Sequence, residues 1–587
     1  MKQVLSVILR IILFLLLAGV LELNRNTVFG WVLFLILTGA WVFLTARLHH
    51  GFLLTLAYLV CFALILYLTW PPIRNVPAVT HKDPEKTEVI TVKDGDLRGV
   101  RTEDGEVEIF AGIPYAKAPI GDLRWKEPQD PEPWVGILEG DHFAPMSMQE
   151  TNLPIYDSLA RIIGYHDYRI SLTDNYRPPV SEDSLYLNIW RPTDIQENTP
   201  VLVYIHGGSL QSGQTWYEDY SGEGLARKGI IVVNLAYRLG VFGFSANEEL
   251  MKESLNHTTG NYGLLDMIKA LEWVRDNIAA FGGDPDQITI AGESAGSASV
   301  SALCTSPLAK GLFRYAILES STVASKEPSH SYRGFEEALS SGRDLMDRYK
   351  VNDLAQLRSL SAEELVKEAE TQHHITVDGY VLTEDPYLSY RKGIHNETAI
   401  LHGYNSKESG PFILFSHASM KDFEERIRRF FGEYADEVLN IYPAGTDEEA
   451  DTYWAEIYGA IYFSYPHYCL DRLAVDNEIP VYEYFFSKEN GRLGPWHSGE
   501  EVYAYHNLPE GSKLYTESDY ALSDIMSDYW VNFVKTGDPN GTGLPNWPQN
   551  LNGSTLMELG EDVQITEERS LKLYEVLDRM YSWKEER

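Results

Sequence analysis

The pentapeptide Gly292–Gly296, which reads Gly-Glu-Ser-Ala-Gly, constrains the fold more than any other feature of this chain. An apolar, β-branched run at 288–291 precedes it, and a run of small residues at 297–302 follows it. A strand, a sharp glycine-flanked turn and a closely packed helix, in this order, hold a serine hydroxyl exposed on a strained backbone. The pattern therefore predicts that Ser294 is a nucleophile. The alternative is a glycine-rich turn without chemistry.

A second glycine-rich segment lies upstream, directly after another predicted strand. Residues 201–205 form a continuous apolar run, which indicates a strand buried on both faces. The next residues, His206-Gly207-Gly208-Ser209, leave their backbone amides unobstructed. We expect the amides of Gly207, Gly208 and Ser209, together with that of Ala295, to bind a developing negative charge. The alternative is an ordinary turn between a strand and a loop.

These motifs and several others resemble those of the type-B carboxylesterases, the α/β-hydrolase family that includes cholinesterases and bacterial esterases acting on aryl esters. The resemblance runs from about Glu88 to the C-terminus, and EDSLYLNIW at 182–190 is similar to the family's EDCLYLNI motif. The other matching segments are FAGIPYA at 110–116, GDLRW at 121–125, NYGLLD at 261–266, FGGDP at 281–285 and KTGDPN at 535–540. The resemblance implies an α/β-hydrolase fold, with a mostly parallel central sheet flanked by helices.

The family's order of catalytic residues, serine then acid then histidine, guides the search for the acid. Residues 398–404 read as a strand, and Glu408 follows it at the position of the acid in the family's GVNxDEG pattern. The glycine of that pattern is displaced by one residue here. Asp385 and Glu384 are rival carboxylates, but they lie in a segment that resembles a structural motif of the family. We therefore expect Glu408 to be the acid.

The base is expected after the next predicted strand, at 480–486. The segment 494–500 resembles the family's GxxHxxE pattern and identifies His497 among the 16 histidines of the chain. His497 is then expected to take the proton from Ser294, while Glu408 fixes the tautomer of the imidazole.

No cofactor and no metal site are predicted. The adjacent histidine pairs His49-His50 and His373-His374 have no carboxylate or cysteine at ligand spacing near them.

The first 75 residues have a different character from the rest. Three apolar stretches, near 3–21, 28–46 and 52–70, are each long enough to span a bilayer as a helix. Arg10 interrupts the first stretch, and a cleaved signal peptide or buried core helices are the alternatives. We expect a three-helix membrane anchor at 1–75, a linker at 76–87 and an α/β-hydrolase domain at 88–587.

Charge constrains the partners. The chain carries a formal net charge of −36, and its acidic excess lies outside the anchor. An acidic surface repels nucleic acid, so the expected partners are a small-molecule ester and, through the anchor, a membrane. Basic residues nearly balance across the short loops. We expect a cytoplasmic N-terminus and, after three spans, an extracytoplasmic hydrolase domain on a bacterial cell membrane; no oligomeric state is predicted.

Cysteine usage differs from that of secreted members of the family, in which a disulfide ends at the cysteine of EDCLYLNI. Here Ser184 occupies that position, and Ser147 occupies the expected partner position. The resemblance therefore implies a bacterial-type member that folds without a disulfide. No role is predicted for Cys304 or Cys469.

Two classes of function fit the sequence. The first is a membrane-tethered serine hydrolase that cleaves short-to-medium acyl or aryl esters through an acyl-enzyme. The alternatives are a non-catalytic adhesion or scaffold module on the same fold, and an amide or carbamate hydrolase. Cholinesterases, which the chain resembles, use a tryptophan in this general region to bind quaternary ammonium by cation–π attraction. The segment 150–179 contains no tryptophan here, so the resemblance disfavours choline esters as substrates.

Overall fold

The structure is a computed structural model that describes residues 2–48, 50–73, 76–79, 83–151, 153–160, 162, 177–327, 332–489 and 494–582. His49, residues 80–82 of the predicted linker and residues 163–176 of the tryptophan-free segment lie outside these ranges. The chain divides into two compact units. One comprises Met1–Pro77 and Thr151–Pro179, and the other comprises Ala78–Glu150 and Val180–Arg587. The domain limits expected at 75 and 87 stay a prediction.

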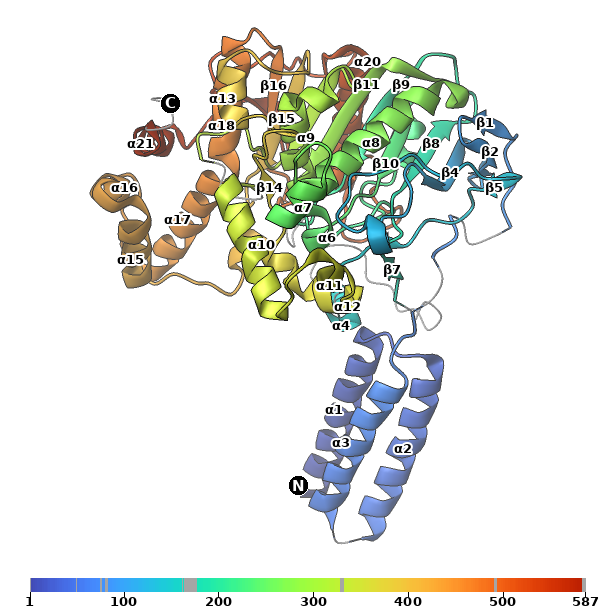
Figure 1. Ribbon diagram of the computed structural model, residues 1–587. Coiled ribbons are helices and arrows are strands. Elements are labelled where there is room, and N and C mark those ends of the chain that lie inside the picture. Colours follow the sequence, from blue (N-terminus) through green and yellow to red (C-terminus); the bar gives the residue numbers. More distant parts are fainter. Residues whose placement is uncertain are drawn as a thin grey trace. The chain divides into compact units, whose positions relative to one another are not determined.

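The smaller unit contains three long apolar helices (Figure 1), namely α1 (Lys2–Leu23), α2 (Val28–Arg47) and α3 (Gly51–Leu68). By length and composition all three are able to cross a membrane. Aromatic rings pack them together: Trp41 stacks on Tyr58, with ring centroids 4.6 Å apart. The Arg10 guanidinium lies over the Trp41 ring, 5.5 Å from its centroid, so its charge faces a neighbouring helix. A short helix, α4 (Pro154–Ala160), completes this unit.

A large, mostly parallel sheet forms the centre of the other unit. The strand order is β18-β17-β16-β15-β12-β11-β9-β10-β8-β4-β3 within the described residues. The strands from β10 to β17 in this order run parallel, and those beyond them pair antiparallel. Their bounds are β3 Val100–Arg101, β4 Val107–Pro114, β8 Tyr186–Pro192, β9 Thr199–Ile205, β10 Ile231–Leu235, β11 Gly283–Glu293, β12 Tyr315–Glu319, β15 Ile400–Asn405, β16 Val481–Phe486, β17 Thr555–Leu559 and β18 Val563–Glu567.

Smaller sheets and many helices surround the main sheet. The remaining strands are β1 Ile90–Val92, β2 Gly95–Arg98, β5 Ile137–Glu139, β6 Met146–Ser147, β7 Val180–Ser181, β13 Tyr332–Arg333 and β14 Ile375–Thr376. The helices are α5 Glu223–Ala226, α6 Gly240–Phe244, α7 Glu248–Glu253, α8 Tyr262–Asn277, α9 Ala295–Thr305, α10 Phe335–Tyr349, α11 Leu354–Arg358, α12 Ala362–Leu365, α13 Pro386–Arg391, α14 Gly410–Ile413, α15 Met420–Phe431, α16 Ala435–Ile441, α17 Asp447–Gly459, α18 Tyr465–Asp476, α19 Glu501–Ala504, α20 Glu517–Thr536 and α21 Leu571–Met580.

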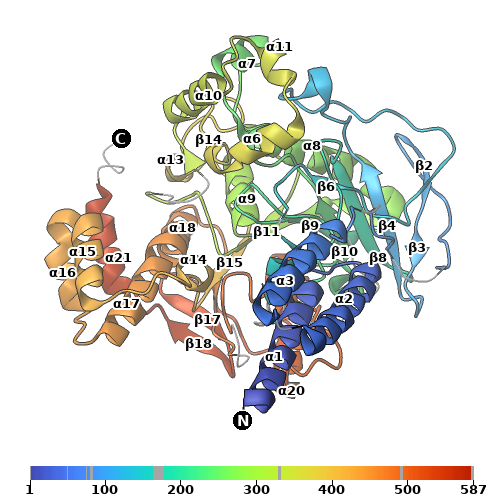
Figure 2. The ribbon, with the colours of Figure 1, turned by 90° about the horizontal axis from the view of Figure 1, so that it is seen from below.

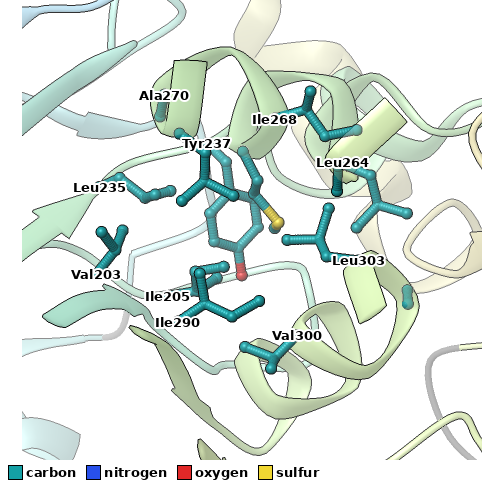
Figure 3. Packing of buried hydrophobic residues seen from close by; sticks show 14 of the residues in the cluster. Val203, Ile205, Leu235, Tyr237, Leu264, Ile268, Ala270, Ile290, Val300 and Leu303 are labelled. Carbon is teal, nitrogen blue, oxygen red and sulfur yellow. The ribbon is translucent and has the colours of Figure 1, made fainter. Parts of the chain in front are cut away.

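Helices cover both faces of the sheet, as the apolar run at 201–205 predicts. Val203 and Ile205 point to one face, where they pack with Leu264 and Val300 from α8 and α9 (Figure 3). Leu202 and Tyr204 point to the other face, where α20 packs. Because β9 is buried on both faces, polar residues appear only after the end of the strand. This edge of the sheet is where the functional residues are expected.

Residues that follow β15 in the sequence form a separate layer of helices. Helices α15, α16, α17, α18 and α21 share an apolar cluster of their own, and α15, α16 and α21 lie side by side in Figure 2. Between α17 and α18 the helix continues through a π-helical turn at Ala460–Ser464. This turn carries aromatic side chains toward the site described next.

Candidate active site

Ser294 occupies the turn between β11 and α9 in a conformation that favours glycine. Its φ and ψ angles are 55° and −124°, outside the regions that L-residues normally adopt. The flanking glycines are required by space, since a Cβ on Gly292 would lie 2.6 Å from the carbonyl carbon of Gly296. A Cβ on Gly296 would collide with the carbonyl oxygen of Ile205 in β9. The sequence thus folds into the expected strand–turn–helix, with the serine hydroxyl partly exposed.

His497 bridges Ser294 and Glu408. Its Nε2 atom lies 2.9 Å from Ser294 Oγ, and its Nδ1 atom lies 2.6 Å from Glu408 Oε2. The three residues lie in the segments that follow β11, β15 and β16, strands whose ends are brought together by the parallel pairing of the sheet. With Nδ1–H donating to the carboxylate, Nε2 is free to accept the proton of the serine hydroxyl.

Glu408 is held by its own loop despite the displaced glycine. The amide of Asn405, the last residue of β15, donates to Glu408 Oε1 (2.7 Å) and leaves Oε2 for His497. The rival carboxylates have other tasks. Asp385 accepts from the amide of Tyr387 at the start of α13, and Glu384 pairs with Lys392.

The expected oxyanion loop lies directly against the serine. A Cβ on Gly207 would approach Ser294 Cβ to 3.0 Å, so the loop and the nucleophile are in contact. Gly208 has a φ of 100°, which favours glycine, and Ser209 has a φ of 55°. Among the described residues, no backbone carbonyl accepts a hydrogen bond from the amide of Gly208, Ser209 or Ala295. These N–H groups are therefore available to an anion.

His206 supports this loop, a role that the sequence did not indicate. Its ring stacks on Tyr237 (4.6 Å between centroids), and its Nδ1 atom lies 2.9 Å from the Gly207 carbonyl oxygen. Burial lowers the pKa of His206 to about 4, so the ring is neutral and Nδ1–H donates. The Tyr237 hydroxyl donates to the His206 carbonyl oxygen (2.8 Å) and fixes the backbone from the other side.

Buried carboxyl groups stand behind the triad. Glu293 Oε1 lies 3.3 Å from His497 Nε2 and accepts from the Ser498 hydroxyl (2.7 Å). Burial, reinforced by the charge of Glu408, raises the pKa of Glu500 to about 7. Burial and the nearby Glu500 raise the pKa of Glu319 to about 8. The GxxHxxE pattern that identified His497 already contained Glu500, but its partners come from distant segments.

Aromatic rings line the side of His497 that faces the helical layer. Phe412 of α14 and Phe463 of the π-helical turn lie 5.2 Å and 4.9 Å from the imidazole, measured between ring centroids. Phe412 also packs on Phe463 and Tyr458. The arrangement offers an apolar, aromatic surface next to His497, which in turn lies within hydrogen-bond distance of Ser294.

Comparisons with known proteins agree with this geometry. A sequence model described as "Carboxylesterase family" matches residues 86–576. Fumonisin B1 esterase of Sphingopyxis macrogoltabida is 32% identical over 512 residues, which cover 83% of this chain and 89% of that protein. Para-nitrobenzyl esterase of Bacillus subtilis (strain 168) is 31% identical over 490 residues, 78% of this chain and 92% of that protein. A crystal structure of a Geobacillus stearothermophilus carboxylesterase at pH 6.2 superposes with a TM-score of 0.71 at 31% identity, covering 84% of this chain and 100% of that one.

Proposed function

The chain belongs to the carboxylesterase family, and on that premise we propose that it is a membrane-tethered serine esterase with Ser294, Glu408 and His497 as its triad. The observation that carries the proposal is the position of His497, within hydrogen-bond distance of both Ser294 (2.9 Å) and Glu408 (2.6 Å). The family of the chain accounts for ester hydrolysis, and the three residues of the triad are the ones proposed to perform it.

In the proposed acylation step, Ser294 Oγ attacks the ester carbonyl carbon while His497 Nε2 accepts the hydroxyl proton. The amides of Gly207, Gly208, Ser209 and Ala295 are proposed to bind the oxyanion of the tetrahedral intermediate. The bond from carbon to the alkoxy oxygen then breaks, and His497 returns the proton to the leaving alkoxide. Glu408 stabilises the imidazolium throughout this step.

Water completes the cycle. His497 accepts a proton from a water molecule, whose oxygen attacks the acyl carbon, and the proton is returned to Ser294 Oγ as the acid leaves. No cofactor or metal takes part in the proposed steps. Short-to-medium acyl esters or aryl esters are the proposed substrates, because Phe412 and Phe463 give the base an aromatic surface.

Helices α1, α2 and α3 are proposed to anchor the enzyme as three membrane spans between an N-terminus in the cytoplasm and a catalytic domain outside it. Protease added to intact cells or spheroplasts tests this orientation. Cleavage of the hydrolase domain without lysis is expected, and full protection until lysis would reverse the assignment.

The catalytic proposal is tested on the detergent-solubilised full chain. Hydrolysis of p-nitrophenyl acetate, butyrate and octanoate, and labelling by a fluorophosphonate, are expected for the parent and for Ser359→Ala, a control at an exposed serine. Both signals are expected to vanish in Ser294→Ala. A folded parent that neither turns over nor labels would favour the non-catalytic module, and hydrolysis of p-nitrophenyl palmitate that equals or exceeds that of the octanoate would overturn the short-to-medium ester class.

A further inference from the structure

A second histidine–carboxylate group lies inside the sheet and takes no part in the proposed reaction. His402 in β15 and Glu483 in β16 are paired in register, and Asp471 of α18 approaches the same point. One donor atom from each of the three lies within 4.8 Å of the other two. All three side chains are closed from solvent. Together with His467 of α18 they are called here the buried histidine cluster.

The donor atoms are held in position by partners on their far sides. His402 Nε2 lies 2.9 Å from Asp471 Oδ1, and its other nitrogen, Nδ1, lies 2.8 Å from His467 Nδ1. Asn550 Nδ2 donates to Asp471 Oδ2 and to Glu483 Oε2, each at 2.8 Å. One amide thus occupies one oxygen of each carboxylate and leaves the other oxygen of each for the interior of the cluster.

The orientation of that amide is fixed by the backbone. Asn550 Oδ1 accepts from the amides of Ser554 and Thr555, each at 3.2 Å, so the nitrogen must face the carboxylates. Metal-binding histidines and carboxylates in proteins are oriented in this way by hydrogen bonds to the atoms that do not bind the metal.

The cluster lacks a positive charge. Among the described residues, no lysine or arginine forms an ion pair with Asp471 or Glu483, whereas the equally buried Asp266 is paired with Arg238 at 2.7 Å. Two ionised carboxylates in the core are very unfavourable without compensation; Asp471 and Glu483, which form a hydrogen bond with each other, can be neutralised by protons or by a cation. A divalent cation held by both oxygens would supply that compensation.

We infer that His402, Asp471 and Glu483 bind a divalent transition-metal ion, with Zn²⁺ the best match to one imidazole nitrogen and two carboxylate oxygens. Tetrahedral Zn²⁺ with bonds of about 2.0–2.1 Å places its donor atoms roughly 3.4 Å apart. The donor atoms here lie within 4.8 Å of one another, and the 2.9 Å between His402 Nε2 and Asp471 Oδ1 would widen to admit the ion. On binding, Nε2 and both carboxyl groups are free of protons, and His402 Nδ1–H donates to His467 Nδ1.

The site is structural by position. It joins β15, β16 and α18, and the loops that carry Glu408 and His497 follow directly from these two strands. The bound ion would therefore stiffen the frame of the triad without touching substrate. The inference is independent of the proposed esterase activity, since Ser294 contributes no ligand.

The decisive measurement is the metal content of the full chain, purified in detergent through a streptavidin-binding tag that contains no histidine. Elemental analysis is expected to find about one equivalent of Zn²⁺, or of another first-row divalent ion, per chain. The same content is expected for Ser294→Ala. His417→Gln is the matched control, because His417 forms an exposed hydrogen bond to Asp451 (2.9 Å) with no described third donor nearby.

Variants of the ligands are expected to lose the metal. Asp471→Asn, Glu483→Gln and His402→Gln should each bind less than about a tenth of an equivalent. After removal of the ion by 1,10-phenanthroline, added Zn²⁺ should raise the Tm of the parent and of His417→Gln, but not that of a ligand variant. Co²⁺ in place of Zn²⁺ should give the visible absorption of a tetrahedral ion.

The parent alone decides the question if the variants do not fold. Less than about a tenth of an equivalent of metal after growth with added Zn²⁺, together with a Tm that Zn²⁺ does not change, overturns the inference. Full metal content in a soluble Asp471→Asn variant overturns it as well, because the ion would then lie elsewhere.

Discussion

Two histidine–carboxylate groups are attached to the same pair of neighbouring strands. They differ in whether their residues lie within these strands or on the loops that follow them. In the proposed triad, Glu408 and His497 lie on the loops that follow β15 and β16, and His497 reaches the partly exposed Ser294. In the buried histidine cluster, His402 and Glu483 lie within these strands and face each other in register. In each group a histidine nitrogen lies within hydrogen-bond distance of a carboxylate: His497 Nδ1 is 2.6 Å from Glu408, and His402 Nε2 is 2.9 Å from Asp471.

The difference shows that position on the sheet decides what such a pair is able to do. Groups beyond the carboxyl ends of parallel strands contact substrate and water, so His497 is placed to transfer a proton to either. Groups inside a sheet buried on both faces have no direct contact with solvent, and their charge must be balanced locally. The same side-chain chemistry is thus proposed to serve proton transfer at one site and metal binding at the other.

Removing each imidazole in turn tests this contrast most strongly. His497→Gln is expected to lower kcat/KM on the order of 10⁵-fold, because the serine loses its base. His402→Gln should lower it by no more than about tenfold, while it removes the metal and lowers the Tm. Hydrolysis of p-nitrophenyl butyrate and thermal unfolding of both variants provide the measurements. Similar losses of activity in the two would mean that the sites are not separate.

Substitution of one carboxylate in each group tests the same contrast. Glu408→Gln is expected to lower kcat about 10⁴-fold, because an amide does not stabilise the imidazolium of His497. The loop should persist, since the Asn405 amide still has an oxygen to donate to. Asp471→Asn is the matched change in the buried histidine cluster and should act on Tm instead. Nearly full kcat in Glu408→Gln would mean that another carboxylate acts as the acid.

The carboxyl groups behind the triad should be balanced by protons rather than by a cation. The pKa of Glu319 is about 8 in the folded chain and about 4.3 when unfolded, so the folded state binds more protons between these values. The stability that this group contributes is present below about pH 4.3 and is lost as the pH rises through 8. Chemical denaturation at pH 5 and pH 8 should therefore show a fall that Glu319→Gln lacks, on the order of 4 kcal/mol.

The control for that measurement is Glu424→Gln, an exposed glutamate paired with Arg428, which should keep the parental pH dependence. An unchanged slope in Glu319→Gln would show that Glu319 is ionised in the folded chain. The cluster should respond in the opposite sense, because metal binding is favoured as the pH rises.

The sequence predicted those parts of the molecule that depend on local patterns. The turn at Ser294 was recognisable because strand, glycines and small-residue helix are adjacent in the chain, and the apolar run of β9 indicated burial on both faces. Glu408 and His497 required the family resemblance, since nothing in their own segments separates them from other carboxylates and histidines.

The buried histidine cluster was not predicted for a physical reason. His402 lies in a segment that reads as a strand, but its partners Asp471 and Glu483 are 69 and 81 residues away in the chain. Only the pairing of β15 with β16 and the packing of α18 bring the donor atoms together. Likewise, the support of the oxyanion loop by His206 depends on a ring contact with Tyr237 that no spacing rule contains.

The smallest expected difference between the two sites concerns backbone strain at Ser294 and at His402. Ser294 has a φ of 55° and a ψ of −124°, whereas His402 is part of a regular strand. A Cβ is unfavourable at the first position and favourable at the second. Ser294→Gly should therefore be more stable than Ser294→Ala by about 1 kcal/mol, and His402→Gly less stable than His402→Ala by a similar amount. Denaturant unfolding of the four variants, each measured after removal of bound metal by 1,10-phenanthroline, gives both differences. If alanine were the more stable residue at 294, the turn would hold the serine without strain, and its exposed position would follow from the crowded glycines alone.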